Sequence, residues 1–345
     1  MPTLLDTLRQ QGTTVDCDTL NVDVAKDLGP FVDCTSNQAI AYFELSKTVD
    51  SKDKLYHEAL IKAAIRDAYA LRGEHQGKAT FEGFAVEIMM VKLQLIIAPH
   101  VTGYVHVQTN PKLSYDTTAT VENAERIISF FKALDPDFSV RRVCIKVPAT
   151  WEGMQACRIL EEKGIATLAT TMFCMEQAAL AADARCRYIA PYVNELKVHF
   201  EKGYVDENKA FDFCHDAAWY YKQDPSIDTQ VLAASLTSVE DVMQLAGIPH
   251  ITISPVLLHE LADTDASSWK GVAGDMTSPR TDGASKRANL AELVKDESRW
   301  RLEFTRSGFG KNEGKIISAI NYFADFQDKL EELVKNMVLK GKKTT

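Results

Sequence analysis

The stretch RVCIKVPATWEG, residues 142–153, joins a short apolar run to a helix-like segment. The run around Lys146 is rich in β-branched residues, which favours a strand. Pro148 closes the run, because proline cannot donate to a strand ladder, and helical spacing follows from Trp151. The stretch therefore predicts a strand that ends at Lys146, then a tight turn, then a helix.

Lys146 is a candidate nucleophile. An amine at the end of such a strand loses part of its hydration, which favours the neutral form that attacks carbonyl groups. The alternative is a strand-end lysine whose aliphatic stem packs while its ammonium group reaches solvent. The pattern taken alone favours this alternative.

Strand-like and helix-like segments alternate along the rest of the chain. The strand-like runs begin near residues 13, 31, 101, 142, 165, 186, 229 and 250. This alternation predicts an α/β fold, a closed (β/α)8 barrel of the TIM type, in a single domain spanning 1–345. An open doubly wound sheet is the structural alternative, but no Gly-x-Gly-x-x-Gly phosphate loop follows any run.

Additional helices are predicted outside the barrel pattern. Helical periodicity covers 3–11, 37–71 and 82–98, the last with a wide apolar face. A polar insert at 263–284 leads into helical stretches at about 284–340, which we expect to pack on the barrel. The residues from Lys340 onward predict a frayed tail.

The composition of the 345 residues argues against several classes of protein. Hydrophobic residues make up 46%, enough for one large core, and the net charge of -9 disfavours nucleic acid or an anionic membrane as partner. The N-terminus lacks the layout of a signal peptide, and no run approaches the ~20 apolar residues of a membrane span. We therefore expect a cytoplasmic protein.

The seven cysteines are scattered and odd in number, with no Cys-x-x-Cys pair. This spacing predicts neither a disulfide framework nor a zinc site. Cys17, Cys34 and Cys144 lie in strand-like runs, and we expect them to be small buried hydrophobic residues.

The segment IKVPATWEG at 145–153 closely resembles the segment around the Schiff-base lysine of transaldolases. Those enzymes move a three-carbon dihydroxyacetone unit between sugars on a (β/α)8 barrel, without a metal or organic cofactor. The resemblance continues in family order and covers the chain to about residue 320. Its other motifs are 13–19 (TTVDCDT), 33–37 (DCTSN), 113–117 (LSYDT), 190–193 (APYV), 234–235 (AS) and 251–255 (ITISP).

The resemblance implies roles for residues at the carboxyl ends of the strands. Lys146 would form the imine, and Asp18 would move the proton of the hydroxyl next to the cleaved bond. Asn37 and Thr35 would bind the donor, and Thr170 would hold the catalytic water. The structural alternatives are a helix N-cap or turn for Asp18 and Asn37, and an ordinary strand threonine for Thr170.

The chain departs from the transaldolase pattern at the water site. Gln108 stands where transaldolases carry a glutamate, and an amide orients a water but cannot take its proton. Tyr192 replaces the usual phenylalanine, although a packing tyrosine is the alternative. Both changes resemble the fructose 6-phosphate aldolase branch, so Gln108, Tyr192 and Thr170 would hold the water. His106, ~7 Å from Gln108 on the same strand face, is expected to be a satisfied interior histidine rather than a proton relay.

A second departure concerns the sugar phosphate. Transaldolases bind it with two arginines, and the matching places here are Glu195 and Thr237, which with Ser235 we assign to substrate binding. Because a carboxylate repels a phosphate dianion, we expect phosphorylated sugars to be poor substrates. Three basic residues would compensate if the loop is rearranged: Arg185, Arg187 and Lys197.

Two classes of function follow. The first is a Schiff-base aldolase or aldol transferase that acts on a ketose or hydroxyketone donor, with an unphosphorylated substrate. Its close variant is orthodox transaldolase action on pentose-phosphate-pathway sugars. The second is a catalytically silent relative that binds a metabolite or a partner protein. The lost glutamate and arginines support the second class, whereas retention of Lys146 and Asp18 opposes it, and we favour the enzyme. A homodimer is expected by resemblance.

Overall fold

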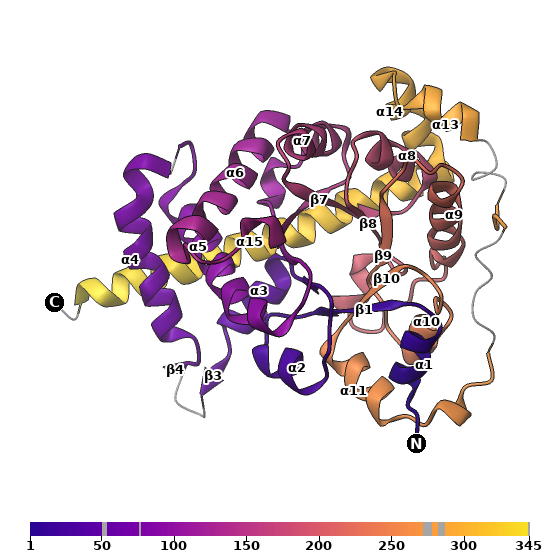
Figure 1. Cartoon of the computed structure of the whole chain (residues 1–345). Coiled ribbons are helices and arrows are strands. Elements are labelled where there is room, and N and C mark those ends of the chain that lie inside the picture. Colours follow the sequence, from indigo (N-terminus) through magenta and orange to yellow (C-terminus); the bar gives the residue numbers. More distant parts are fainter. Residues whose placement is uncertain (50–53, 76, 272–277, 282–286, 344–345) are drawn as a thin grey trace.

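A closed barrel of parallel strands forms the centre of the molecule (Figure 1). The computed structural model describes residues 1–49, 54–75, 77–271, 278–281 and 287–343. Around the barrel the strands follow the order β1-β10-β9-β8-β7-β6-β5-β2, which confirms the predicted (β/α)8 barrel and rules out the open sheet. The strands are β1 Thr14–Asp18, β2 Cys34–Thr35, β5 Val105–Gln108, β6 Val143–Pro148, β7 Ala166–Met172, β8 Tyr188–Pro191, β9 Gln230–Ala233 and β10 His250–Ile253.

Strand β6 extends beyond the residue at which the sequence predicts its end. It continues past Lys146 to Pro148, and the N–H of Ala149 still donates to β7 at 2.9 Å. Proline removes only one donor, so the ladder resumes at the next residue. Lys146 pairs in register with Gln108 on β5 and Leu168 on β7. It is therefore an interior strand residue, 3% exposed, and not a strand-end lysine with a solvated head.

Helices surround the barrel and follow most of the strands. They are α1 Leu4–Gln10, α2 Val22–Asp27, α3 Gln38–Leu45, α4 Glu58–His75, α5 Phe81–Ile97, α6 Thr117–Leu134, α7 Trp151–Glu162, α8 Met175–Asp183, α9 Phe211–Lys222, α10 Val239–Met243 and α11 Pro255–Asp263. The broad apolar face predicted for 82–98 is explained by the neighbours of α5, which packs against α4, α6 and the C-terminal helix.

Two segments differ from the sequence prediction. Helix α2 is not predicted, because six residues are too few to display helical periodicity. The continuous helix predicted over 37–71 is wrong, since the antiparallel pair β3 Thr48–Val49 and β4 Lys54–Leu55 separates α3 from α4. The polar run SKTVDSKD at 46–53 lacks the apolar spacing of a packed helix, so α3 ends before it.

The C-terminal helix crosses the carboxyl ends of the barrel strands. Helices α13 Arg287–Leu293 and α14 Glu297–Arg306 lead into α15 Lys311–Lys343, the long yellow helix in Figure 1. Helix α15 packs against α3, β7 and two short 3-10 turns, η2 Pro111–Leu113 and η4 Leu196–His199. Because α3, η2 and η4 follow β2, β5 and β8, α15 lies over the barrel mouth.

The helical character predicted for the C-terminal part is confirmed, but the predicted frayed tail is not. Residues from Lys340 continue α15 to Lys343. Of the polar insert predicted at 263–284, residues 272–277 and 282–284 lie outside the described residues. The preceding part holds the end of α11 and the 3-10 turn η5 Ala266–Ser268.

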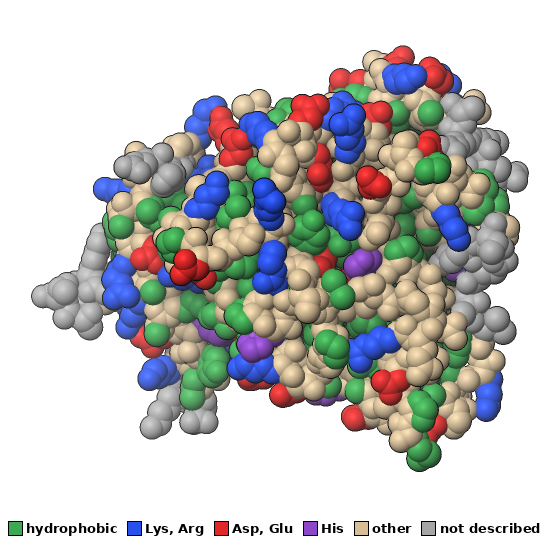
Figure 2. All heavy atoms as spheres, in the orientation of Figure 1, with side chains coloured by type: hydrophobic (Ala, Val, Ile, Leu, Met, Phe, Trp, Pro, Cys, Tyr) green, Lys and Arg blue, Asp and Glu red, His purple; other side chains and the backbone are tan. Residues whose placement is uncertain are grey.

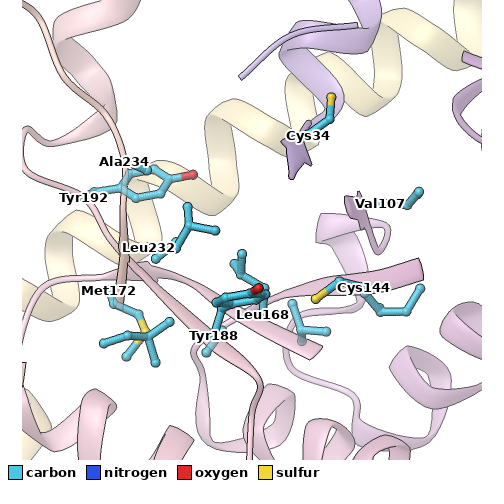
Figure 3. Packing of buried hydrophobic residues seen from close by; sticks show 14 of the residues in the cluster. Cys34, Val107, Cys144, Leu168, Met172, Tyr188, Tyr192, Leu232 and Ala234 are labelled. Carbon is cyan, nitrogen blue, oxygen red and sulfur yellow. The ribbon is translucent and has the colours of Figure 1, made fainter. Parts of the chain in front are cut away.

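The barrel interior is closely packed, and Figure 3 shows Cys144, Leu168 and Tyr188 meeting inside it. All seven cysteines are buried and free, which confirms that Cys17 and Cys34 act as small hydrophobic residues. Among the described helices, none combines the length and apolarity needed to cross a bilayer. On the face drawn in Figure 2, acidic and basic side chains are intermingled.

Candidate active site

Lys146 occupies the floor of the barrel mouth. Its Nζ donates to the backbone oxygen of Ser36 at 3.4 Å, and it forms no ion pair with a carboxylate of the described residues. The Ser36 hydroxyl in turn donates to the His106 carbonyl at 2.8 Å and accepts from Gln94 Nε2 at 3.0 Å, which holds this turn in place. Burying a cation without a counter-ion costs free energy. Packing alone therefore does not account for a lysine at this position.

Asp18 ends β1 beside a pair of threonines. Thr35 Oγ1 lies 2.6 Å from Asp18 Oδ1 and 2.6 Å from Thr252 Oγ1. Because a carboxylate only accepts, the Thr35 hydroxyl donates to Asp18 and receives the proton of Thr252. Thr252 is absent from the sequence-predicted site, although it stands in the 251–255 motif and faces inward by strand alternation. The two threonines fix the orientation of the Asp18 carboxylate.

Gln108, Thr170 and Tyr192 come from three strand ends around the mouth. Thr170 Oγ1 donates to Tyr192 Oη at 3.4 Å, and Figure 3 shows the Tyr192 ring directed to the interior. The Gln108 side chain is 1% exposed, yet neither its amide oxygen nor its nitrogen has a hydrogen-bond partner among the described residues. Buried amides are almost always paired. This amide is therefore positioned for a water or a substrate group, whereas a direct bond from Gln108 to Thr170 or Tyr192 is not formed.

Asn37 caps helix α3 and still faces the mouth region. Its Oδ1 accepts from the backbone N–H of Ile40 at 3.0 Å, as the N-cap alternative predicts. The cap uses only the oxygen, and Nδ2 makes no hydrogen bond to a described residue. The same residue can thus end the strand-to-helix turn and offer a donor to a ligand.

Glu195 and Thr237, the residues at the family's arginine positions, are both engaged by neighbouring loop residues. Glu195 accepts a short hydrogen bond from the Tyr204 hydroxyl, which raises the pKa of Tyr204 to about 12. Both the N–H and the hydroxyl of Thr237 donate to Asp241 Oδ2, at 3.1 and 2.9 Å. Asp241 also pairs with Lys209 at 2.7 Å. Thr237 therefore shapes the loop after β9, and its hydrogen-bonding groups are already used.

The basic residues considered as substitutes for the arginines do not form a phosphate clamp. Arg187 stacks on the Tyr188 ring at the start of β8, and Arg185 lies in the turn before it, so both are at the amino end of the barrel strands. Lys197 is on the mouth side, in η4, where it pairs with Glu201 at 3.4 Å and lies over the Tyr204 ring.

A cleft of about 770 Å³ opens next to Glu195. Its walls come from the loop after β8 and from the start of α15, and they carry charges of both signs. Lys315 pairs with Asp206 at 3.0 Å, and Asp206 also accepts from the N–H of Glu195 at 2.8 Å. Lys315 additionally lies over the Phe173 ring, which contacts Tyr192. The cleft is thus connected to the water site through one aromatic ring.

A layer of buried charged and polar residues lies below Lys146 and Gln108. Asp16 Oδ1 accepts from the N–H of Asp33 and Oδ2 pairs with His250 at 2.9 Å, while Asp33 Oδ2 pairs with His106 at 2.9 Å. Burial, with the nearby Asp33 charge, raises the pKa of Asp16 to about 6. Burial acts in the same direction on Asp33. The hydrogen bond and charge of His106, the N–H of Tyr104 and the charge of His250 together outweigh burial, so the pKa of Asp33 is lowered.

This layer explains His106. Its Nε2 is paired with Asp33, in agreement with the predicted interior histidine, while its buried Nδ1 has no partner in the part of the chain that the structure describes. Asp16, Asp33 and His250 lie within 4.8 Å of one another, a spacing that suits a metal. The carboxylate oxygens are, however, already paired with protein donors, since Asp33 Oδ1 accepts from the N–H of Tyr104 at 2.7 Å. The donor set is therefore that of a structural network.

His199, which the sequence does not single out, lies at the mouth next to Ser235. Its Nε2 is 2.9 Å from Ser235 Oγ, and Ser235 Oγ donates to the Asn194 carbonyl at 2.7 Å. Ser235 has a φ of 60°, so its side chain is presented from a tight turn at the end of β9. Although the residue keeps an exposed surface, the protein packed around its ring reduces hydration and lowers the pKa of His199, and the charge of Asp18 partly offsets this effect. No motif in 196–203 indicates this contact, because it depends on how the loop folds back.

The known proteins that this chain resembles all point to the same family. The family described as Transaldolase/Fructose-6-phosphate aldolase matches residues 15–308. A transaldolase of Cellvibrio japonicus is 30% identical over 334 residues, covering 95% of this chain and 96% of its own length. A transaldolase of Alteromonas mediterranea is 29% identical, covering 92% and 94%, and one of Thermosynechococcus vestitus is 28% identical, covering 96% and 81%.

These matches run through β1 to α14 and so include every barrel strand. The family consists of transferases and aldolases that perform aldol chemistry, which makes this chain an enzyme of that kind. At about 30% identity it is a divergent member. The chain belongs to the transaldolase/fructose-6-phosphate aldolase family.

Proposed function

We propose that this chain is a class I aldol transferase or aldolase in which Lys146 forms an imine with a ketose or hydroxyketone. The observation that carries the proposal is the buried Lys146, which has no counter-ion among the described residues. It pairs in register with Gln108, whose amide likewise has no partner among them. A carbonyl carbon bound to Lys146 would lie among hydroxyl, amide and carboxylate groups from separate strands.

Each step has a candidate group. The Lys146 amine adds to the ketone carbon, and water leaves as the C=N bond forms. Asp18, oriented by Thr35, takes the proton of the hydroxyl on the far side of the breaking C–C bond, so that the aldehyde departs and an enamine remains. The enamine then attacks an acceptor aldehyde, or is protonated and hydrolysed.

Gln108, Thr170 and Tyr192 would hold the water that serves imine formation and hydrolysis. An amide cannot be a base, so we assign proton transfer to the water and the Tyr192 hydroxyl. Asn37 Nδ2 would bind a donor hydroxyl. No residue of this mechanism requires a metal or an organic cofactor.

The acceptor is proposed to be unphosphorylated. Glu195 replaces an arginine, Thr237 is used by Asp241, and Arg185 and Arg187 lie at the opposite end of the barrel. A phosphate dianion would therefore meet a carboxylate where transaldolases place a guanidinium group. Orthodox transaldolase action on pentose-phosphate-pathway sugars is the second candidate, and the names of the relatives favour it.

Borohydride trapping tests the proposal. Intact mass is measured after reduction in the presence of dihydroxyacetone, fructose or fructose 6-phosphate, for the wild type and for Lys146→Ala. We expect an adduct with the first two donors that is lost in Lys146→Ala, with Lys163→Ala, an exposed helix-end lysine, as the matched control. A stronger adduct and turnover with the phosphorylated donor would favour the orthodox activity.

If no donor modifies Lys146, the result would instead favour the catalytically silent relative.

We further propose that residues 1–345 act as one domain, and that the protein is a homodimer in the cytoplasm. Sedimentation velocity of the purified chain tests the dimer.

A further inference from the structure

His199 is the imidazole that stands at the barrel mouth. It ends the 3-10 turn η4, Leu196–His199, in the loop between β8 and α9. The turn packs under α15, which holds it over the carboxyl ends of the strands. Of the other histidines, His106 and His250 belong to the buried layer below, and His100 precedes β5 at the amino end of the barrel.

The hydrogen bonds of His199 define its tautomer. Ser235 has one hydroxyl proton, which it donates to the Asn194 carbonyl at 2.7 Å. The 2.9 Å contact with His199 Nε2 must therefore be a bond from the ring N–H to Ser235 Oγ. The lone pair of the neutral ring is then on Nδ1, which makes no hydrogen bond to a described residue. His199 is thus held at one nitrogen and can bind a ligand with the other.

The charges around His199 are paired with one another rather than with its ring. On its own turn, Lys197 pairs with Glu201, and Glu201 also accepts from Tyr322 of α15 at 2.6 Å. Glu195 is bound by Tyr204. From β1, Asp18 is the group whose charge acts on the ring, and it favours the imidazolium form. Because the surrounding protein outweighs Asp18, the pKa of His199 is lowered and the ring is neutral at neutral pH.

We propose that His199 is an acceptor-binding residue, whose Nδ1 accepts a hydrogen bond from the hydroxyl of a neutral hydroxyaldehyde and which determines whether neutral or anionic acceptors are preferred. This inference rests on the proposed aldol function and deepens it. The ring contacts Ser235 after β9 and is near enough to Asp18 to be affected by its charge, so it lies at the mouth beside the proposed chemical groups.

The state of the ring decides which acceptor binds well. A neutral imidazole accepts a hydrogen bond from a hydroxyl group, whereas an imidazolium offers an N–H and a positive charge to a carboxylate or phosphate. Lowering the pH therefore shifts preference from a neutral to an anionic acceptor. The ratio of kcat/KM for the two acceptors isolates this effect, since any change in the donor step is common to both acceptors.

The test uses dihydroxyacetone as donor with two acceptors of equal carbon number, glycolaldehyde and glyoxylate. Glyoxylate remains anionic over the range from pH 5.5 to 8, so its own ionisation does not interfere. We expect His199→Gln to raise the KM for glycolaldehyde about tenfold with little change in kcat. In the wild type the glyoxylate to glycolaldehyde ratio of kcat/KM should rise at least about fivefold from pH 8 to 5.5, and the rise should be absent in His199→Gln.

The matched control is His100→Gln, at the other end of the barrel, which should behave as the wild type. The dihydroxyacetone adduct trapped by borohydride should be the same in the wild type and in both variants. An unchanged acceptor KM in His199→Gln, or the same pH-dependent ratio in that variant, overturns the role of His199 and leaves the aldol function standing. If the wild type itself forms no adduct, both the aldol function and the role of His199 are overturned.

Discussion

The proposed donor side and the proposed acceptor side of this site are built differently. The donor side consists of strand residues, with Lys146 on β6, Asp18 on β1 and Thr35 on β2, and their neighbours are set by the barrel register. The acceptor side consists of the loops after β8 and β9, in which Glu195 and His199 are held by side-chain contacts. The family residues Lys146 and Asp18 are retained on the strands, where Gln108 at the end of β5 is a replacement, whereas Glu195 and Thr237 in the loops stand where the resemblance places two arginines. Barrel enzymes vary specificity in this way, because loops change without disturbing the core.

The largest expected effect is on the donor side. Asp18→Asn should lower the rate of C–C bond cleavage by ~10²–10⁴-fold, because the amide cannot take the hydroxyl proton. Imine formation with dihydroxyacetone breaks no C–C bond, so the borohydride adduct should persist. Asp23→Asn, an exposed carboxylate on α2, is the control and should retain full activity. A loss of both activities in Asp18→Asn would indicate a structural role instead.

A smaller loss is expected where the two sides meet, at the water site. Tyr192→Phe removes the hydroxyl that lies 3.4 Å from Thr170 and should lower kcat about tenfold. Combined with Thr170→Val, the losses should be less than additive, because both variants disturb the same water. Tyr221→Phe, which removes a buried hydroxyl bonded to Ala178, is the control. Additive losses would show that the two side chains act separately.

Substitutions on the proposed acceptor side should change the KM for charged acceptors and leave the chemical step unchanged. Glu195→Arg should lower the KM for glyceraldehyde 3-phosphate about tenfold while the KM for glyceraldehyde stays within about twofold. Glu207→Arg, on the exposed rim of the same cleft, makes the same charge change and serves as control. Equal effects of the two substitutions would mean that the KM depends on the overall electrostatic field and not on the position of the charge. The distinction between the two sides would then not be supported.

The last expected effect is on stability rather than on activity and concerns the buried layer on which the proposed donor side rests. The pKa of Asp16 is raised to about 6 from 3.8, so the folded state holds this proton more tightly than the unfolded state. The resulting stabilisation is complete below pH 3.8 and is lost as the pH rises through 6. The free energy of unfolding should therefore fall by up to about 3 kcal/mol from this group over that window, and Asp16→Asn should flatten the fall.

Urea unfolding of the wild type and Asp16→Asn at pH 4.5, 5.5 and 6.5 measures this difference. His259→Gln, an exposed residue on α11, should leave the profile unchanged. If the profile of Asp16→Asn parallels that of the wild type, the ionisation of this layer does not contribute to the stability of the donor side.

Most of the barrel could be predicted from local patterns. The run around Lys146, the eight-fold alternation and the helix of 151–163 indicate elements whose periodicity depends on neighbours in sequence. The errors have the same origin. Pro148 was expected to end β6, yet a parallel ladder continues when only one donor is missing, and α2 was too short to show a period.

The candidate site was predictable only in part. Lys146, Asp18 and Gln108 could be named because family motifs mark the strand ends, whereas Thr252 needed the closure of β10 against β1 to come within reach of Thr35. No sequence motif indicated a role for His199. The engagement of Thr237 by Asp241 was equally invisible, since four residues of sequence separation do not specify a loop conformation.

The sequence by itself determined the strands, the order of the barrel and the chemical groups on its inward face, because alternation along a strand assigns each side chain to a face. Only the tertiary structure decided which of these groups meet. Closure of the barrel brought Thr252 to Asp18's partner Thr35, and the path of α15 over η4 placed His199 against Ser235. Contacts of this kind join residues far apart in the chain, and their geometry depends on packing that no local pattern encodes.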